Sequence, residues 1–255
     1  MDRKFDFPPV LIDKLRAARR VTVLTGAGTS AESGVPTFRE AQTGLWSKFR
    51  PEDLATPEAF RQNPRMVWEW YAWRRELVEQ AAPNPGHYAL ARTETFVPSF
   101  TVVTQNVDGL HQRAGNKKVL ELHGSITRTK CFTENTVVES WPETSSVPPP
   151  CPKCGSHLRP DVVWFGEALP DGIFERALAA STGCDLFFSI GTSSFVYPAA
   201  SLAHEALRQG ITVVEINPQA TDLTPKATFS FQSRSGELLP ALVAATWPAA
   251  HMGEC

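Results

Sequence analysis

The segment WEWYAWRRE, residues 68–76, places a phenol and a guanidinium three positions apart. In a helix this spacing puts Tyr71 and Arg74 on the same face. An arginine offers a fork of donors that matches a carboxylate, and the phenol adds another donor. The pair therefore indicates a site for an acidic group. The alternative is a Tyr71 packed in the core beside a solvated Arg74.

A glycine-rich turn follows the apolar run 21–25. Gly26, Gly28 and Ala31 satisfy the pattern G-x-G-x-x-A, with Ala27 inside it. Glycine lets the backbone approach a pyrophosphate, and the N-terminus of a following helix then faces the negative charge. A hydride-transfer Rossmann domain also carries an acidic residue about 20 positions on, at the end of a second strand. Here that region reads KFRPEDLATP, which disfavours this class.

Polar residues also follow two further apolar runs. The segments TQNVDGLHQRAG, residues 104–115, and KVLELHGS, residues 118–125, each contain the expected end of a strand. Ligands of open α/β sheets bind at the carboxyl ends of strands. Asn106, Asp108 and His123 are therefore candidate site residues, whereas His111 and His87, in helical segments, are interpreted as structural.

Several short runs rich in apolar and β-branched residues predict buried parallel strands. They cover residues 21–25, 101–105, 119–122, 186–190, 211–216 and 228–231. Helical stretches separate many of them, at residues 9–19, 109–114, 171–180, 198–208 and 236–245. This alternation predicts an α/β fold with a Rossmann-like, doubly wound parallel sheet.

Two stretches interrupt the alternation and are expected to form a smaller domain. One is helical, residues 35–97, and the other contains a C-x-x-C pair, residues 125–167. The larger domain then comprises residues 8–34, 98–124 and 168–246.

The 25 Lys and Arg residues nearly balance 27 Asp and Glu, and the net charge of -2 gives no reason to expect a nucleic-acid partner. The N-terminus lacks the apolar region of a signal peptide, and no apolar run approaches the roughly 18 residues of a membrane span. Five cysteines, an odd number, favour reduced thiols or a metal over a disulfide framework. We expect a cytoplasmic monomer that does not bind membranes.

Six motifs occur in one order within residues 8–246: GAGTSAESGVPTFR, TQNVDGLH, LHGS, VVWFGE, GTSSFVYPA and VVEINP. In this succession the chain resembles the sirtuins. The resemblance implies an NAD-dependent protein-lysine deacylase that releases nicotinamide and O-acyl-ADP-ribose. It also implies that Asn106 and Asp108 hold the nicotinamide-ribose end and that His123 is the general base. Histidine suits that role because its ordinary pKa is about 6.5.

The resemblance assigns further contacts to the cofactor and the substrate. For NAD these are Phe38 and Arg39 in a flexible loop, Gln105, and on the adenosine side Gly191, Thr192, Ser193, Asn217 and Ser235. The substrate is an acylated-lysine protein whose backbone pairs edge-on with residues 159–170, a mode that reads main chain more than sequence. The contacts implied there are Val163, Trp164, Phe165, Gly166 and Glu167.

The desuccinylase and demalonylase group of sirtuins carries a Y-x-x-R pair, which Tyr71 and Arg74 match. Ala55, in the segment DLATP, stands where that group has a small residue. The resemblance thus implies removal of succinyl and malonyl groups, and of acetyl groups more weakly. The alternatives are a mono-ADP-ribosyltransferase that uses the same pocket and a non-catalytic module that binds NAD or ADP-ribose.

Sirtuins usually hold a structural zinc between two C-x-x-C pairs. Cys151 and Cys154 form one pair, but Cys131 is followed by Phe-Thr-Glu, so that Glu134 stands in place of the fourth cysteine. Residues 125–167 are therefore expected to be zinc-ribbon-like. Three alternatives remain: Glu134 is the fourth ligand, water or another group is the fourth ligand, or the site is empty.

Overall fold

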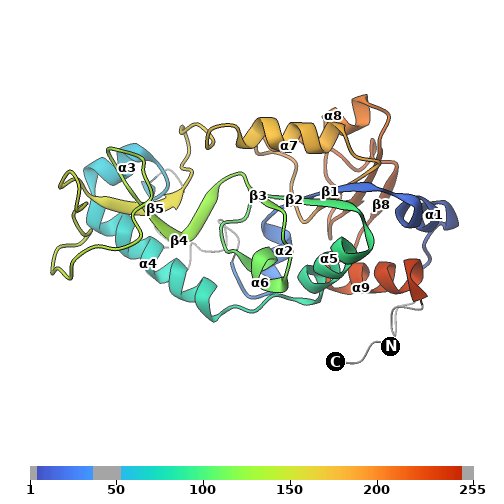
Figure 1. Cartoon of the computed structure of the whole chain (residues 1–255), viewed down its shortest axis with the longest axis horizontal. Helices are drawn as coiled ribbons and strands as arrows, with labels where there is room; N and C mark the ends of the chain where they lie inside the picture. Colours follow the sequence, from blue (N-terminus) through green and yellow to red (C-terminus); the bar gives the residue numbers. More distant parts are fainter. Residues whose placement is uncertain (1–4, 37–52, 249–255) are drawn as a thin grey trace.

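The computed structural model describes residues 5–36 and 53–248, and it has two parts (Figure 1). The larger part is built on a six-stranded sheet. The smaller part lies at the opposite end of the long axis from α1 and α9, and it combines a two-stranded sheet with helices α3 and α4.

The large sheet is parallel throughout, with the strand order β3-β2-β1-β6-β7-β8. Counted among themselves along the chain, the strands run 3-2-1-4-5-6, the order of dinucleotide-binding doubly wound sheets. The predicted fold class is therefore confirmed. The order reverses between β1 and β6, and ligands bind at the carboxyl ends of strands at such a point. The bounds are β1 Arg20–Thr25, β2 Ser99–Thr104, β3 Val119–Glu121, β6 Leu186–Ile190, β7 Thr212–Ile216 and β8 Phe229–Phe231.

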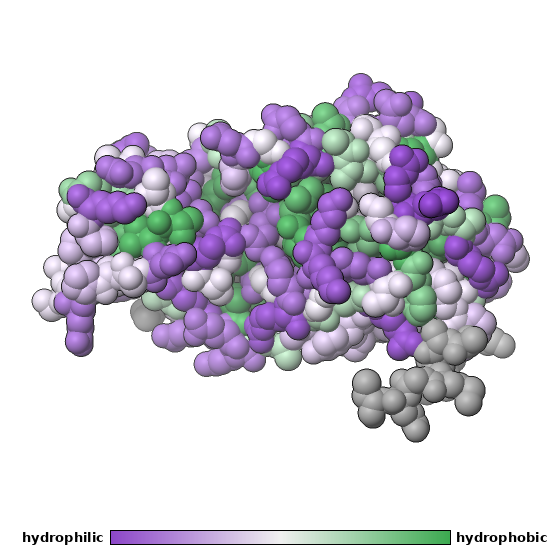
Figure 2. Space-filling model, in the orientation of Figure 1, coloured by the Kyte–Doolittle hydropathy of each residue, from purple (hydrophilic) through white to green (hydrophobic). Residues whose placement is uncertain are grey.

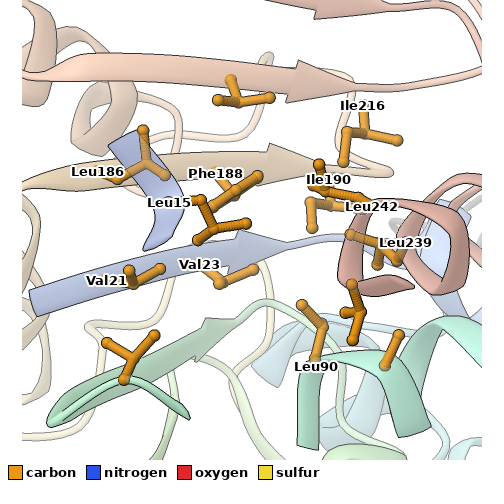
Figure 3. Close-up of a cluster of buried hydrophobic side chains, with 14 of the residues drawn as sticks. Leu15, Val21, Val23, Leu90, Leu186, Phe188, Ile190, Ile216, Leu239 and Leu242 are labelled. Atoms are coloured by element: carbon orange, nitrogen blue, oxygen red, sulfur yellow. The ribbon is translucent and has the colours of Figure 1, made fainter. Parts of the chain in front are cut away.

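Helices cover both faces of this sheet because successive strand residues point to opposite sides. Val21 and Val23 of β1 pack with α1, α5 and α9 on one face (Figure 3). Leu24 of the same strand packs with α7 and α8 on the other face. Burial on both faces explains why these strands are almost continuously apolar. The bounds are α1 Pro9–Ala17, α5 Pro85–Phe96, α7 Ile173–Thr182, α8 Ser201–Arg208 and α9 Ser235–Thr246.

Helix α5 begins with a reciprocal cap. The side chain of Asn84 accepts a hydrogen bond from the His87 backbone, and the Asn84 backbone donates to His87 Nδ1. Ala89 and Leu90 of this helix lie in the core of the large sheet. Helix α5 falls within residues 35–97, which the sequence assigned to the smaller domain; the domain boundary itself stays a prediction.

The smaller part has an apolar core of its own. Phe60, Trp70, Ile126 and Trp164 are buried together between the helices and the antiparallel pair of β4 and β5. The bounds are α3 Pro57–Gln62, α4 Pro64–Gln80, β4 Gly124–Cys131 and β5 Leu158–Val162, and two short helices of the larger part are α2 Ala27–Ala31 and α6 Leu110–Ala114.

Hydrophilic residues predominate on the face shown in Figure 2, and hydrophobic residues form small separate patches there. Within residues 5–36 and 53–248, no helix has the length and apolar character needed to cross a bilayer.

Gly124 joins the large sheet to β4 with a backbone φ of +77 degrees, in the left-handed region. A Cβ at this position would lie 2.1 Å from the carbonyl oxygen of Asp161. We expect Gly124→Ala to lower the free energy of unfolding by more than the roughly 1–2 kcal/mol that left-handed backbone costs. Gly210→Ala is the control in urea unfolding, because Gly210 has a φ of +70 degrees but no atom within 4 Å of the added Cβ. Equal losses in the two variants would contradict this explanation.

Candidate functional site

The carboxyl ends of three neighbouring strands form one row. In the parallel register, Thr25 of β1 pairs with Thr104 of β2 and with Ile190 of β6. The loops that start at Gly26, Gln105 and Gly191 therefore emerge side by side. Each of these loops was predicted from the sequence to contact the cofactor, and the structure brings their first residues together.

The loops after β1 and β6 pack backbone against backbone. The Gly28 N–H donates to the Gly191 carbonyl at 2.9 Å, and a Cβ on Gly26 or Gly28 would lie 2.8 Å from that oxygen. Gly191 has a φ of +60 degrees, and its own Cβ would lie 2.5 Å from the backbone nitrogen of Thr29. Only glycine fits at all three positions, so this edge of the sheet carries no side chains there.

A buried hydrogen-bond network lies beside the glycine turn. The Asn106 side-chain amide donates to the Gly26 carbonyl at 3.0 Å and to the Ser30 hydroxyl at 2.8 Å. The Ser30 hydroxyl in turn donates to Asp108 at 2.7 Å, and Leu110 N–H donates to the other carboxylate oxygen. Burial raises the pKa of Asp108, and these two hydrogen bonds oppose that rise. The network connects β2 to the turn after β1.

Ser30 was not among the site residues predicted from the sequence, although it connects Asn106 to Asp108. The available signal was its place directly after the glycine turn, in the segment SAESG. A serine there is common in turns, and only the hydrogen bonds between distant segments single it out.

His123 follows β3 and faces the end of β2. Its Nδ1 lies 3.0 Å from the Gln105 carbonyl, which can only accept, so Nδ1 carries the proton and Nε2 keeps a lone pair. Burial lowers the pKa of His123, and the hydrogen bond to Gln105 partly offsets this. A neutral imidazole with a free Nε2 lone pair has the form required of a general base. The Gln105 side chain donates to Thr192 at 3.0 Å and so connects β2 to the loop after β6.

The other predicted cofactor residues lie in different surroundings. Thr192 is buried and Ser193 is exposed. Asn217 follows β7, and its side chain donates to the Gln219 carbonyl. Ser235 begins α9, and its hydroxyl donates to Glu32 at 2.6 Å. The predicted residues Phe38 and Arg39 lie outside the described residues, and the cofactor contacts of the whole set stay predictions.

The predicted substrate segment starts at the candidate base. Val163 N–H donates to the His123 carbonyl at 2.9 Å, and Phe165 N–H donates to the Ala55 carbonyl at 2.9 Å. Both backbone donors are thus engaged within the protein. Phe165 is 53% exposed, whereas Trp164 is 2% exposed. Gly166 follows in the left-handed region with a φ of +84 degrees and has open space around it.

Arg159, which sequence analysis did not identify, holds this segment in place. Its guanidinium lies 3.2 Å from the centroid of the Trp164 ring and forms an ion pair with Glu167. Glu167 also accepts a hydrogen bond from Trp164 N–H at 2.8 Å. The Trp164 indole N–H donates to the Tyr71 hydroxyl at 3.0 Å, so the predicted acyl pocket and the substrate segment share one network.

A family model described as the Sir2 family matches residues 26–198, which include the glycine turn, His123 and Trp164. The chain belongs to the Sir2 family. It is 51% identical to NAD-dependent protein deacylase 2 of Pyrobaculum aerophilum over 231 residues, covering 91% of this chain and 92% of that protein.

Two solved structures extend the comparison. One is a Sir2 homologue in complex with NAD, 44% identical, with a TM-score of 0.89 and coverage of 96% of this chain and 95% of that one. The other is a mutant Sir2 homologue in complex with 2′-O-acetyl-ADP-ribose, 43% identical, with a TM-score of 0.87 and coverage of 98% and 100%.

The geometry of this Sir2 chain fits NAD. The strand order reverses where the glycine turn and the Gly191 loop meet, and their backbones leave an edge without side chains. Asn106 and Asp108 lie next to this edge, and His123 faces the end of the same strand. Helix α2 has only five residues, and the Gly28 amide already binds Gly191, so the helix N-terminus offers fewer free donors than the motif predicted.

Three thiols fit a zinc ion. The sulfurs of Cys131, Cys151 and Cys154 lie within 4.8 Å of one another. Two turns with the same hydrogen bonds present them: the carbonyls of Cys131 and Cys151 accept from the fourth residue onward, Asn135 and Gly155 respectively. These thiols supply three of the four ligands of a tetrahedral structural zinc site.

The same correspondence places Glu134 where the other turn has Cys154. Glu134 is exposed, and its carboxylate is not part of the thiol cluster; its backbone N–H lies 3.4 Å from the Cys131 sulfur as a donor. The structure therefore brings three of the four predicted ligands together, and Glu134 as a ligand stays a prediction.

We expect the purified protein to contain zinc and Glu134→Cys to release it more slowly to a chelator, because a fourth thiolate replaces an oxygen ligand. Elemental analysis gives the zinc content and a colorimetric chelator gives the release rate. Cys154→Ser is the control and is expected to lose zinc. Wild-type protein that contains no zinc after purification with zinc present would contradict the fit.

Proposed function

We propose that this protein is an NAD-dependent protein-lysine deacylase that prefers succinyl and malonyl groups to acetyl groups. Membership in the Sir2 family and the deacylase names of its relatives support the general activity. The observation that carries the preference for acidic groups is the hydrogen bond between the buried Tyr71 hydroxyl and Trp164, and Arg74 and Ala55 support it.

In this proposal the chain's own residues bind, orient and move a proton. Bound NAD supplies the ribose carbon that receives the acyl oxygen as nicotinamide leaves. Asn106, Asp108 and Ser30, which fix one another by hydrogen bonds, orient the nicotinamide-ribose end. Nε2 of His123 takes the proton of a ribose hydroxyl. The protein accelerates the reaction by holding the acyl oxygen and the ribose carbon close together and in line. This positioning requires no nucleophile from the protein.

The direction of the Tyr71 hydrogen bond sets what the hydroxyl can offer a ligand. Trp164 Nε1 is a donor only, so the Tyr71 oxygen accepts and its own proton remains available. Burial raises the pKa of Tyr71 to about 12, so the phenol is protonated at neutral pH. A buried phenol that donates matches the carboxylate of a succinyl or malonyl group.

Arg74 adds a positive charge beside this phenol. Its guanidinium lies 4.9 Å from the centroid of the Trp70 ring, and it interacts electrostatically with Tyr71 and Asp108. Burial lowers the pKa of Arg74, which means that the cation is costly in this environment. An anionic acyl group reduces this cost, whereas an acetyl group does not.

Ala55 provides room in the same core. Its side chain is buried with Tyr71 and Trp164, and its carbonyl accepts the hydrogen bond from Phe165. A larger side chain here would take up volume in the core that contains the phenol. The small residue therefore supports a longer acyl chain.

We expect Arg74→Met to lower kcat/KM for a succinylated peptide by roughly thirtyfold or more, because loss of one partner of a buried charge pair costs at least about 2 kcal/mol. Deacetylation should remain near the wild-type rate. The measurement is a panel of acetyl, succinyl, malonyl and glutaryl peptides, with and without NAD, followed by mass spectrometry.

Arg75→Met is the matched control for this panel. Arg75 is the neighbouring residue on α4, but its guanidinium donates to the Ile126 carbonyl at 2.9 Å and so contributes to packing. Equal losses of desuccinylation and deacetylation in Arg74→Met would contradict the acidic pocket. Peptide that gains the mass of ADP-ribose, or no nicotinamide release at all, would contradict the deacylase proposal itself.

We expect kcat/KM for deacylation to fall at acidic pH with a midpoint below 6.5, the ordinary pKa of histidine. The base must be neutral, burial lowers the pKa of His123, and activity is lost as pH falls through that lowered pKa. The measurement is a pH profile of kcat/KM at fixed ionic strength. A midpoint at or above 6.5 would show that His123 is not desolvated as described.

A further inference from the structure

A chain of buried hydrogen bonds runs from helix α6 to the catalytic end of β2. His111 Nε2 lies 2.9 Å from the Thr25 hydroxyl, and the Thr25 hydroxyl donates to the Thr104 hydroxyl at 2.9 Å. The Thr104 oxygen also accepts the Asn106 backbone N–H at 3.1 Å. All four residues are at least nine-tenths buried.

The direction of each bond follows from counting protons. The single hydroxyl proton of Thr25 points to Thr104, so Thr25 can only accept from His111. With this direction of the Thr25–Thr104 bond, Nε2 of His111 carries the proton. The chain then runs in one direction, from the His111 N–H through the two threonines, and it meets the Asn106 N–H at the Thr104 oxygen.

The neighbourhood of His111 keeps this imidazole neutral. Its ring centroid lies 4.8 Å from that of His87, which completes the capping box of α5 with Asn84. Burial lowers the pKa of His111 to about 3 and that of His87 to about 4. A neutral ring has one N–H, so with the proton on Nε2 the Nδ1 atom is an acceptor, and the Asn116 side chain is the other polar group that interacts with this ring.

We propose that His111 is a positioning residue that sets the orientation of Asn106 through Thr25 and Thr104. The inference rests on the proposed function, because Asn106 is the residue expected at the nicotinamide-ribose end. The Asn106 backbone is held by Thr104 and its side chain by Gly26 and Ser30, so both ends of the residue are fixed.

The stability of the fold does not by itself require this chain of hydrogen bonds. Replacing both partners of a buried hydrogen bond by apolar groups of the same shape is often nearly neutral. The residues two positions earlier on these strands, Val23 and Val102, are buried and apolar and belong to the core. Thr25 and Thr104 stand where the two strands end beside the site. The chain of hydrogen bonds that they form ends on Asn106, a residue of the site.

The test compares two substitutions of His111. Gln retains an N–H donor at a similar distance from the backbone, whereas Leu removes it. We expect His111→Leu to lower kcat roughly ten- to a hundredfold, as small misplacements near the reacting groups do. The Kd for ADP-ribose should change less than about threefold, since ADP-ribose keeps its adenosine and pyrophosphate groups and lacks the nicotinamide whose orientation is at issue. His111→Gln should restore most of kcat.

A second pair of variants tests the proposal independently, in case His111→Leu does not fold. Thr25→Val removes a link of the chain and should show the same separation of kcat from ADP-ribose affinity. Thr22→Val is its control: Thr22 lies on the same strand, is equally buried, and donates to the Ala180 carbonyl on the far face from His111. We expect it to retain the wild-type kcat.

One readout does not depend on activity. Long-range ¹⁵N–¹H spectra of the imidazoles report the tautomer directly, and His111 should show the Nε2–H form. The Nδ1–H form would overturn the inference, and so would equal kcat in His111→Leu and His111→Gln or in Thr25→Val and Thr22→Val. If wild-type protein released no nicotinamide, the proposed function would fail, whereas the tautomer would still test the hydrogen-bond chain.

Discussion

Gly26 and Gly28 approach the Gly191 carbonyl so closely that a Cβ on either would lie 2.8 Å from its oxygen. This approach holds together the loops after β1 and β6 at the point where the strand order reverses. Asn106 donates to the Gly26 carbonyl, and Gln105 donates to Thr192. These two hydrogen bonds hold the end of β2 against the loops after β1 and β6. His123, the predicted base, is then oriented by the Gln105 carbonyl. A side chain in this contact would displace each of these groups.

The smaller part is attached to that site by a second set of buried interactions. Arg159 stacks on Trp164 and pairs with Glu167, and Trp164 in turn donates to Tyr71. A buried guanidinium is tolerated only when it is paired and hydrogen-bonded, and Arg159 satisfies this with Glu167 and the Val162 carbonyl. The predicted substrate segment is therefore held by several buried contacts where it passes the predicted acyl pocket.

Much of the fold could be predicted because it depends on local patterns. The six apolar runs became the six strands of the large sheet within one or two residues, since strands buried on both faces must be apolar throughout. Helix α5 was harder to place, because it lies in the long stretch between two predicted strands and only the contacts of Ala89 and Leu90 show which sheet it covers. Ser30 and Arg159 were missed for the same reason: a serine in a turn and an arginine before a proline carry no local signal of their partners.

The sequence by itself determined which chemical groups are present and their order along the chain: a glycine turn, an imidazole after a strand, a phenol near a guanidinium, and three thiols with a glutamate in place of a fourth. Tertiary structure decided which of them meet and in what protonation state. The proton of His123 lies on Nδ1 because a carbonyl from another strand faces it, and Tyr71 is a donor because an indole from a distant segment occupies its oxygen. Burial and hydrogen-bond direction depend on neighbours that are remote in the chain, and therefore only the folded structure specifies them.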